Sequence, residues 1–181
     1  MSNITLLSNG IIRLRCPEPE DITLLYQIEN DVTLWSISNN MAPYSYYQLR
    51  KYVEESCHDV YQDKQIRFMI ERIADGAVMG CIDLTNINFL NRRAEVGIMV
   101  LKEFRHQGIG STALNILYQY ARQMLELNQL YSLVVSTNLP AIKLFTSNGF
   151  SQSGSLKEWL RDKSSYHDVT LFQKKIEKKD G

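Results

Sequence analysis

The chain has 181 residues, of which 44% are hydrophobic and 22% are charged, and this composition excludes a disordered or fibrous chain. We expect one soluble domain over residues 1–181. Lysine plus arginine and aspartate plus glutamate both number 20, so the chain has no net charge that attracts nucleic acid. The N-terminus lacks a secretory signal and no apolar run approaches the length of a membrane span. We therefore expect a cytoplasmic protein with no membrane contact.

The first predicted element is a strand at 11–16, where apolar and charged side chains alternate. Two prolines end this strand, and acidic residues then open a helix over 20–30. Ser45 predicts the N-terminal cap of a second helix that extends through Val53. The segment between the two helices, 35–44, has little regular period and is a candidate substrate loop.

Three antiparallel strands are predicted next, at 66–73, 77–87 and 94–101. Asp75-Gly76 is a strong hairpin-turn signal between the first two strands, and residues 91–93 provide the second turn. The third strand is nearly all apolar, which indicates a central place in the sheet.

The clearest helix in the chain runs from Ile109 to Leu127, with apolar residues at steps of three and four. A short β-branched strand at 131–136 follows it, so strand, helix and strand form a crossover that should be parallel and right-handed. The chain then closes with a helix and two strands, at 139–147, 150–159 and 165–175.

The loop before the long helix carries the strongest indication of a ligand. The first backbone N–H groups of a helix lack partners and its dipole is positive there, while glycines let the backbone approach phosphate oxygens. A Walker loop is excluded because no lysine follows Gly110. A dinucleotide fingerprint fits Gly108 to Ala113, but the next strand ends at Ser136-Thr137 where that fold needs an acidic residue.

A third interpretation of the loop is the motif R-x-x-G-x-G, given by Arg105, Gly108 and Gly110. Two further motifs accompany it: Asn91-Arg92-Arg93-Ala94-Glu95 and Asn138-x2-Ala141-x2-Leu144-Phe145-x3-Gly149-Phe150. With these three motifs, the chain resembles the GNAT superfamily of N-acetyltransferases over nearly its whole length. Within that superfamily the chain is similar to the branch of spermidine N-acetyltransferases and of enzymes that acetylate ribosomal-protein N-termini. The resemblance implies an α/β fold with a mixed, mostly antiparallel seven-stranded sheet flanked by helices on both faces.

The resemblance also implies acetyl-CoA as co-substrate and a primary amine as acceptor, on a polyamine, a protein N-terminus or an amino sugar. The loop amides would hold the pyrophosphate, and the pantetheine arm would lie between two splayed strands at 98–101 and 131–136. The residues it implies for coenzyme binding are Ile98, Met99, Val100, Leu101, Arg105, His106, Gln107, Gly108, Ile109, Gly110, Ser111, Asn138 and Phe145.

Two catalytic roles follow from the resemblance. Glu95 would act as general base on the acceptor ammonium, and the alternative is a structural carboxylate paired with Arg92 or Arg93. A main-chain N–H near Met99 or Val100 would donate to the oxyanion of the tetrahedral intermediate.

Phe145 stands where the family usually has a tyrosine that protonates the departing sulfur. Phenylalanine has no proton to donate, which leaves Tyr131, Tyr166 or a water as the acid. A thiol with a pKa of about 8.5 is also a tolerable leaving group as thiolate. The departure favours an alternative function, a catalytically weak acyl-CoA-binding module of the same fold.

No metal site is predicted, because no pair of histidines has metal-ligand spacing. The three cysteines are widely separated and odd in number, which disfavours a disulfide framework or a CxxC metal site, and we interpret them as buried or half-buried free thiols: Cys16, Cys57 and Cys81. The family often forms homodimers or larger homo-oligomers, and the residues themselves do not decide the assembly.

Overall fold

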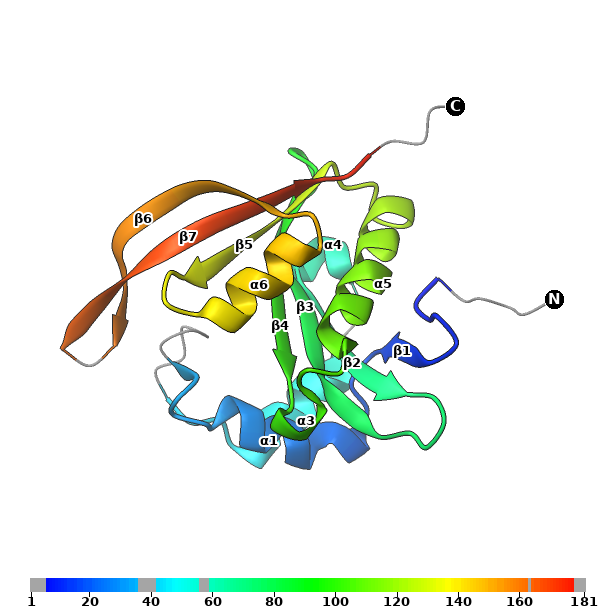
Figure 1. Cartoon of the computed structure of the whole chain (residues 1–181). Coiled ribbons are helices and arrows are strands. Elements are labelled where there is room, and N and C mark those ends of the chain that lie inside the picture. Colours follow the sequence, from blue (N-terminus) through cyan, green and yellow to red (C-terminus); the bar gives the residue numbers. More distant parts are fainter. Residues whose placement is uncertain (1–5, 36–41, 56–58, 163, 178–181) are drawn as a thin grey trace.

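The computed structural model describes residues 6–35, 42–55, 59–162 and 164–177 (Figure 1). Seven strands form one mixed sheet in the order β1-β2-β3-β4-β5-β7-β6, with β4 at its centre. All neighbouring strands are antiparallel except β4 and β5, which run parallel. The strands are β1 (Ile12–Arg15), β2 (Ile66–Arg72), β3 (Val78–Asn88), β4 (Arg93–Val100), β5 (Gln129–Val135), β6 (Ser151–Asp162) and β7 (Ser165–Lys175). The predicted fold class is confirmed.

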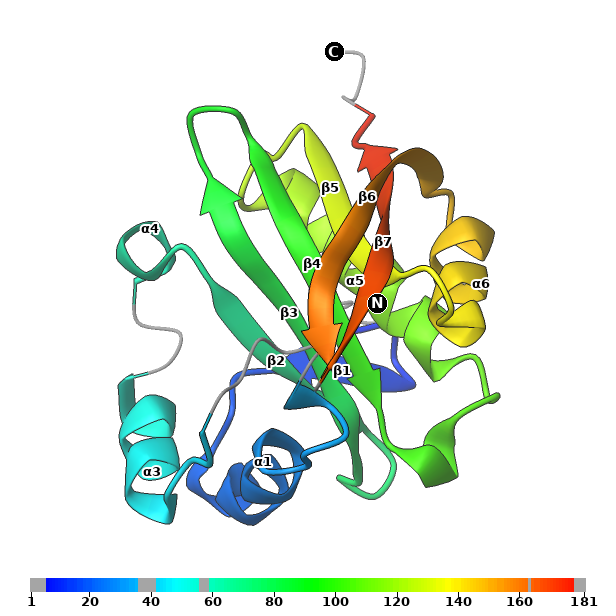
Figure 2. The same cartoon turned by 90° about the vertical axis from the view of Figure 1, so that its left-hand side faces the viewer.

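Helices cover both faces of this sheet (Figures 1 and 2). α5 and α6 pack on one face, and α1 and α3 pack on the other. The α-helices are α1 (Ile22–Glu29), α3 (Tyr46–Glu55), α4 (Val60–Asp63), α5 (Ile109–Gln123) and α6 (Leu139–Ser147). Two short 3-10 turns precede α1 and α5, η1 (Pro19–Asp21) and η2 (Lys102–Phe104). No helix in the described part of the chain has both the length and the apolar character to cross a bilayer.

The alternation of side chains along the central strands explains why two cores form. Phe68, Ile82 and Val96 belong to the core under α5 and α6. Their neighbours Met69 and Cys81 point to the opposite face and pack with α1 and α3. Successive side chains of a strand point to opposite faces, so these nearly continuous apolar runs require cover on both sides.

Two helices differ most from the sequence prediction, while β5 begins two residues earlier and β6 ends three residues later than predicted. α5 ends at Gln123 rather than at Leu127, because Glu126 adopts a positive φ of 48° and the chain leaves the helix. Leu127 is still buried, and its N–H donates to the carbonyl of Ala121, so it extends the apolar stripe from outside the helix. α4 is not predicted from the sequence; it is a single turn capped by Asp59.

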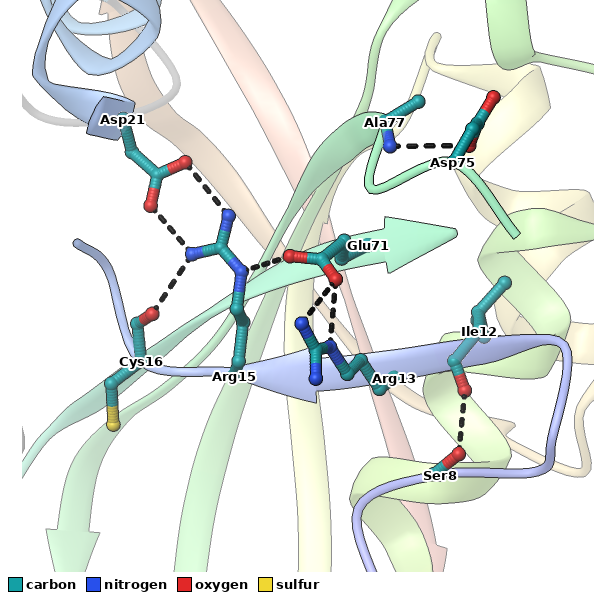
Figure 3. A network of polar contacts seen from close by, with 9 residues as sticks. All are labelled: Ser8, Ile12, Arg13, Arg15, Cys16, Asp21, Glu71, Asp75 and Ala77. Carbon is teal, nitrogen blue, oxygen red and sulfur yellow. Dashed lines mark hydrogen bonds and ion pairs between the residues drawn. The ribbon is translucent and has the colours of Figure 1, made fainter. Parts of the chain in front are cut away.

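Ion pairs tie the edge strand β1 to the rest of the sheet (Figure 3). Arg15 donates to both carboxylate oxygens of Asp21 at 2.6 and 3.0 Å and also pairs with Glu71 on β2. Arg13 donates to Glu71 from the other side at 2.7 Å. Burial opposes ionisation of Glu71, but the hydrogen bonds from Arg15 and Arg13 outweigh it and lower its pKa. The network positions η1, and therefore α1, against the sheet.

The cysteines differ from the expectation of three free thiols. Cys16 is disulfide-bonded, which corrects that interpretation for this residue. Cys81 is a buried free thiol, and burial raises its pKa to about 12. Cys57 and most of the candidate substrate loop, 36–41, lie outside the described residues.

Candidate active site

The parallel strands β4 and β5 pair over only three residues. The pairs join Arg93–Glu95 to Gln129–Tyr131, and Glu95 opposite Tyr131 is the last of them. Both strands continue beyond this pair, β4 to Val100 and β5 to Val135, while β5 stays paired with β7 on its other side. The strands therefore part beyond Glu95, and Ile98, Met99 and Val100 lie along the opening as predicted.

The loop that leaves β4 folds back on the strand. The Nε atom of Arg105 donates to the carbonyl of Val100 at 2.9 Å, and the side-chain amide of Gln107 donates to the carbonyl of Glu103 at 2.8 Å. His106 and Gly108 both have positive φ, at 62° and 77°. A tight, internally bonded turn thus joins the end of the opening to the start of α5.

Gly108 is the N-cap residue of α5 and has no side chain, so no side-chain hydrogen bond caps this helix. The first backbone N–H groups of α5 have no acceptor within the helix and carry the positive end of its dipole. A cap made by a carboxylate or hydroxyl would occupy one of these donors. The uncapped terminus therefore leaves the donor set that a phosphate group needs, as the sequence predicted.

Gly110 serves a different purpose from Gly108. A Cβ atom at Gly110 would lie 3.1 Å from a methyl carbon of Leu144, so glycine permits α5 to approach α6 closely. Ser111 accepts a hydrogen bond from the amide of Asn148 at the end of α6, at 2.9 Å. Gly110 and Ser111 therefore hold α5 against α6. The backbone around Gly108 remains available to a ligand.

Asn138 follows the end of β5 and begins α6. Its Oδ1 atom accepts from the backbone N–H of Ala141 at 3.2 Å, so it caps this helix. Phe145 is only 3% exposed, and its ring packs against Phe150 and Phe172 with centroid distances of 5.0 and 6.4 Å. Phe145 is therefore a core residue, and the contacts of Asn138 and Phe145 with the coenzyme stay predictions.

Glu95 is placed at the vertex where the two strands part. Its Oε2 atom accepts a hydrogen bond from the side-chain amide of Asn86 at 2.9 Å. Tyr131 lies opposite, and its pKa is raised by burial and by the negative charge of Glu95. Among the ion pairs of the described ranges, none joins Glu95 to Arg92 or Arg93, so the structure does not support the alternative of a paired structural carboxylate.

A second polar group on the same face of the sheet was missed by the sequence analysis. Arg67 on β2 donates to both oxygens of Asp83 on β3 at 2.9 and 2.7 Å, and it also pairs with Glu29 at the end of α1. Asp83 lies beside Gly97 of β4, since a Cβ atom there would be 3.8 Å from the Cβ of Asp83. The signal in the sequence that could have indicated this group is a charged residue inside each of two apolar strands, Arg67 in β2 and Asp83 in β3.

Gly80 on β3 is a further residue that the sequence analysis missed. Its φ is +150°, and a Cβ atom on it would lie 2.0 Å from the carbonyl oxygen of Met99. The N–H of Leu101 also bonds to the carbonyl of Met79 at 2.9 Å, so β3 holds the end of β4 from this side. Gly80 therefore sets the orientation of the Met99 peptide, which borders the opening.

Comparison with known families identifies one match over most of the chain. The family model described as acetyltransferase (GNAT) domain matches residues 12–151. The spermidine N(1)-acetyltransferase of Vibrio cholerae is 27% identical over 161 residues, which are 89% of this chain and 91% of that protein. A putative ribosomal N-acetyltransferase of Bacillus subtilis is 32% identical over 98 residues, 54% of each chain.

Comparison with solved structures agrees with this match. The crystal structure of spermidine N-acetyltransferase from Vibrio cholerae in complex with CoA and spermine superposes with a TM-score of 0.81. The two chains are 24% identical, and the match covers 93% of this chain and 97% of the other. At this identity the superposition shows a shared fold.

Proposed function

Because the chain belongs to the acetyltransferase (GNAT) domain family, we propose that it transfers the acetyl group of acetyl-CoA to a primary amine. The observation that carries this proposal is the opening between β4 and β5, which leads to the uncapped N-terminus of α5. The family match ends at residue 151, but β6 and β7 continue the same sheet. We therefore assign the whole chain, 1–181, to one N-acetyltransferase domain.

The coenzyme is assigned to the backbone on both sides of the opening. Main-chain amides from 108 to 111 bind the pyrophosphate, with Arg105 beside them. The edge of β4 that does not pair with β5 runs from Ile98 to Val100, and its free backbone groups offer hydrogen bonds to the amides of the pantetheine arm, although the carbonyl of Val100 already accepts from Arg105. Asn138 contacts the coenzyme from the end of β5. The chemistry of this donor set fits a long ligand with a diphosphate at one end.

The reaction begins with the loss of a proton from the acceptor ammonium to Glu95, directly or through a water. The neutral amine attacks the thioester carbonyl, and the oxyanion that forms accepts a hydrogen bond from the main chain at Met99 or Val100. The intermediate then expels the thiolate of CoA, and the acetylated nitrogen loses its second proton. We assign Tyr131 as the phenol that protonates the thiolate and that regains a proton from this nitrogen, because Tyr131 lies opposite Glu95 whereas Tyr166 is on the β6–β7 hairpin.

A cationic acceptor is supported by the charges on this face of the sheet. Glu29, Asp83 and Glu95 are carboxylates, and Arg67 is the guanidinium that pairs with the first two. Arg67 therefore neutralises Glu29 and Asp83, whereas Glu95 forms no ion pair among the described residues, and this carboxylate is the one that an alkylammonium would meet. A polyamine, a protein N-terminus and an amino sugar each present such a group, and spermidine is the first compound to test because relatives carry that activity in their names.

The test is to incubate the purified protein with acetyl-CoA and a panel of primary amines while following the free thiol. Release of CoA that depends on the amine is the expected result. Glu95→Gln should lower turnover across pH 6 to 9 and leave coenzyme affinity, measured by calorimetry, unchanged. A well-folded protein that gives no calorimetric heat with CoA or acetyl-CoA would refute the proposal.

A second candidate function is a binding module that retains the coenzyme with little catalysis. The buried ring of Phe145, at a position where a phenol would supply a proton, favours it. This candidate predicts heat of binding with acetyl-CoA but no thiol release with any amine. If Phe145→Tyr leaves the rate unchanged, the missing phenol does not limit turnover.

A further inference from the structure

An irregularity in β3 lies directly opposite Glu95. Thr85 pairs with Glu95 and Asn88 pairs with Arg93, so the register between β3 and β4 breaks between these two pairs. Within the break, Asn86 has a φ of +49°, in the left-handed region, and it is exposed. Asparagine is among the few residues other than glycine that tolerate this conformation.

The break turns the side chain of Asn86 toward Glu95. Its Nδ2 atom donates to Glu95 Oε2 at 2.9 Å, which is good hydrogen-bond geometry. Glu95 is the last residue of β4 that pairs with β5, so the contact is made at the vertex of the opening. The break in register by itself requires only a positive φ at this position. Glycine would adopt that φ without an amide side chain.

The choice of an amide at this position has a chemical consequence. An amide N–H orients a carboxylate but adds no charge, whereas a lysine or arginine at the same place would neutralise it. A base must stay ionised and must point in one direction to take a proton. A neutral amide donor therefore fixes the orientation of the carboxylate and leaves its negative charge intact.

We propose that Asn86 is a positioning residue for Glu95, which holds the carboxylate toward the acceptor amine. The proposal rests on the proposed function, in which Glu95 is the general base. Asn86 itself touches no substrate. Its amide also contacts Tyr131 and, against the larger effect of burial, lowers the pKa of that phenol, so a role through the orientation of Glu95 requires that the loss in Asn86→Gly persists in the Tyr131→Phe background.

The test uses Asn86→Gly, which keeps the positive φ and removes the amide. We expect kcat to fall about 10- to 100-fold, as misplacement of a catalytic group commonly does, while the KM for acetyl-CoA and the calorimetric affinity for CoA stay unchanged. Asn86→Asp keeps the shape but places a second carboxylate beside Glu95, and its kcat should fall at least as far. The matched control is Glu158→Gly, which changes another left-handed residue, with a φ of 48°, inside the register break of the edge strand β6, and should behave as wild type.

A double-mutant cycle separates positioning from a general structural effect. In the Glu95→Gln background, Asn86→Gly should lower kcat no further, because the group through which it acts has been removed. Wild-type kcat in Asn86→Gly, or an equal loss in both backgrounds, overturns the inference. If Glu95→Gln is slow while Asn86→Gly is not, the base assignment stands and this inference alone fails; if the wild type releases no thiol with any amine, the proposed function itself fails.

Discussion

Gly80→Ala offers a direct test of how β3 shapes the end of β4. The new Cβ atom would lie 2.0 Å from the carbonyl oxygen of Met99, and ordinary contact begins at 3.4 Å, so the two backbones must separate by about 1.4 Å. The position of the Cβ atom is fixed by the main chain of residue 80, and the oxygen belongs to the main chain of Met99, so no flexible side chain can absorb the clash. The positive φ of Gly80 adds strain for any residue with a Cβ atom.

The magnitude follows from these two costs. Overpacking and a sparsely populated backbone conformation each cost about 1 to 3 kcal/mol, so we expect about 2 to 6 kcal/mol of destabilisation. For a chain of this length that lowers the melting temperature by about 4 to 24 °C. A displacement on the order of 1 Å in the Met99 peptide should also lower kcat about 100-fold, because that peptide is proposed to donate to the oxyanion.

Thermal unfolding and thiol release measured on the same preparation test this prediction. Gly154→Ala is the matched control, because Gly154 lies in a strand, has no positive φ and has nothing within 4 Å of the added atom. We expect that control to change stability by no more than about 0.5 kcal/mol. If both variants melt together and turn over equally fast, the reasoning about Gly80 is refuted.

Three further predictions concern single side chains. Burial and the charge of Glu95 raise the pKa of Tyr131, so wild-type turnover should show no alkaline fall from Tyr131 below about pH 10, and Tyr131→Phe should lower kcat if this phenol is the acid. Glu71→Gln should lower the free energy of unfolding at pH 7 by about 1 to 3 kcal/mol. Because the pKa of Glu71 is lowered in the folded state, the stability that its carboxylate contributes is present above the pKa of the unfolded state and is lost as pH falls through the pKa of the folded state. Urea titrations of wild type and variant should therefore converge in acid. Arg105→Ala should weaken CoA binding about tenfold by calorimetry, since it removes a cation near the phosphates and the hydrogen bond to Val100.

The sequence predicted those parts of the molecule whose determinants are local. Gly108 and Asn138 cap helices within a few residues of themselves, and short-range motifs describe such positions well. The boundaries of α6 were predicted to the residue for the same reason. The end of α5 was predicted four residues too late, because Leu127 continues the apolar period after the backbone has left the helix.

The parts that the sequence did not reveal depend on register between strands. Asn86 reaches Glu95 only because β3 breaks its pairing between Thr85 and Asn88, and no periodicity in the sequence marks that break. Gly80 is required by the carbonyl of Met99 on the neighbouring strand, so its constraint lies 19 positions away in the chain. Cross-strand constraints of this kind become visible only when the pairing is known.

The two halves of the proposed site therefore differ in how they are encoded. The coenzyme half is one stretch of backbone from β4 into α5, where few side chains are needed and a short motif suffices. The acceptor half combines Glu29, Arg67, Asp83 and Glu95, which come from four different elements and contribute through their side chains. Because these side chains take no part in the backbone pairing of the sheet, substitutions at Glu29 and Asp83 should change the preferred amine while the affinity for CoA is retained.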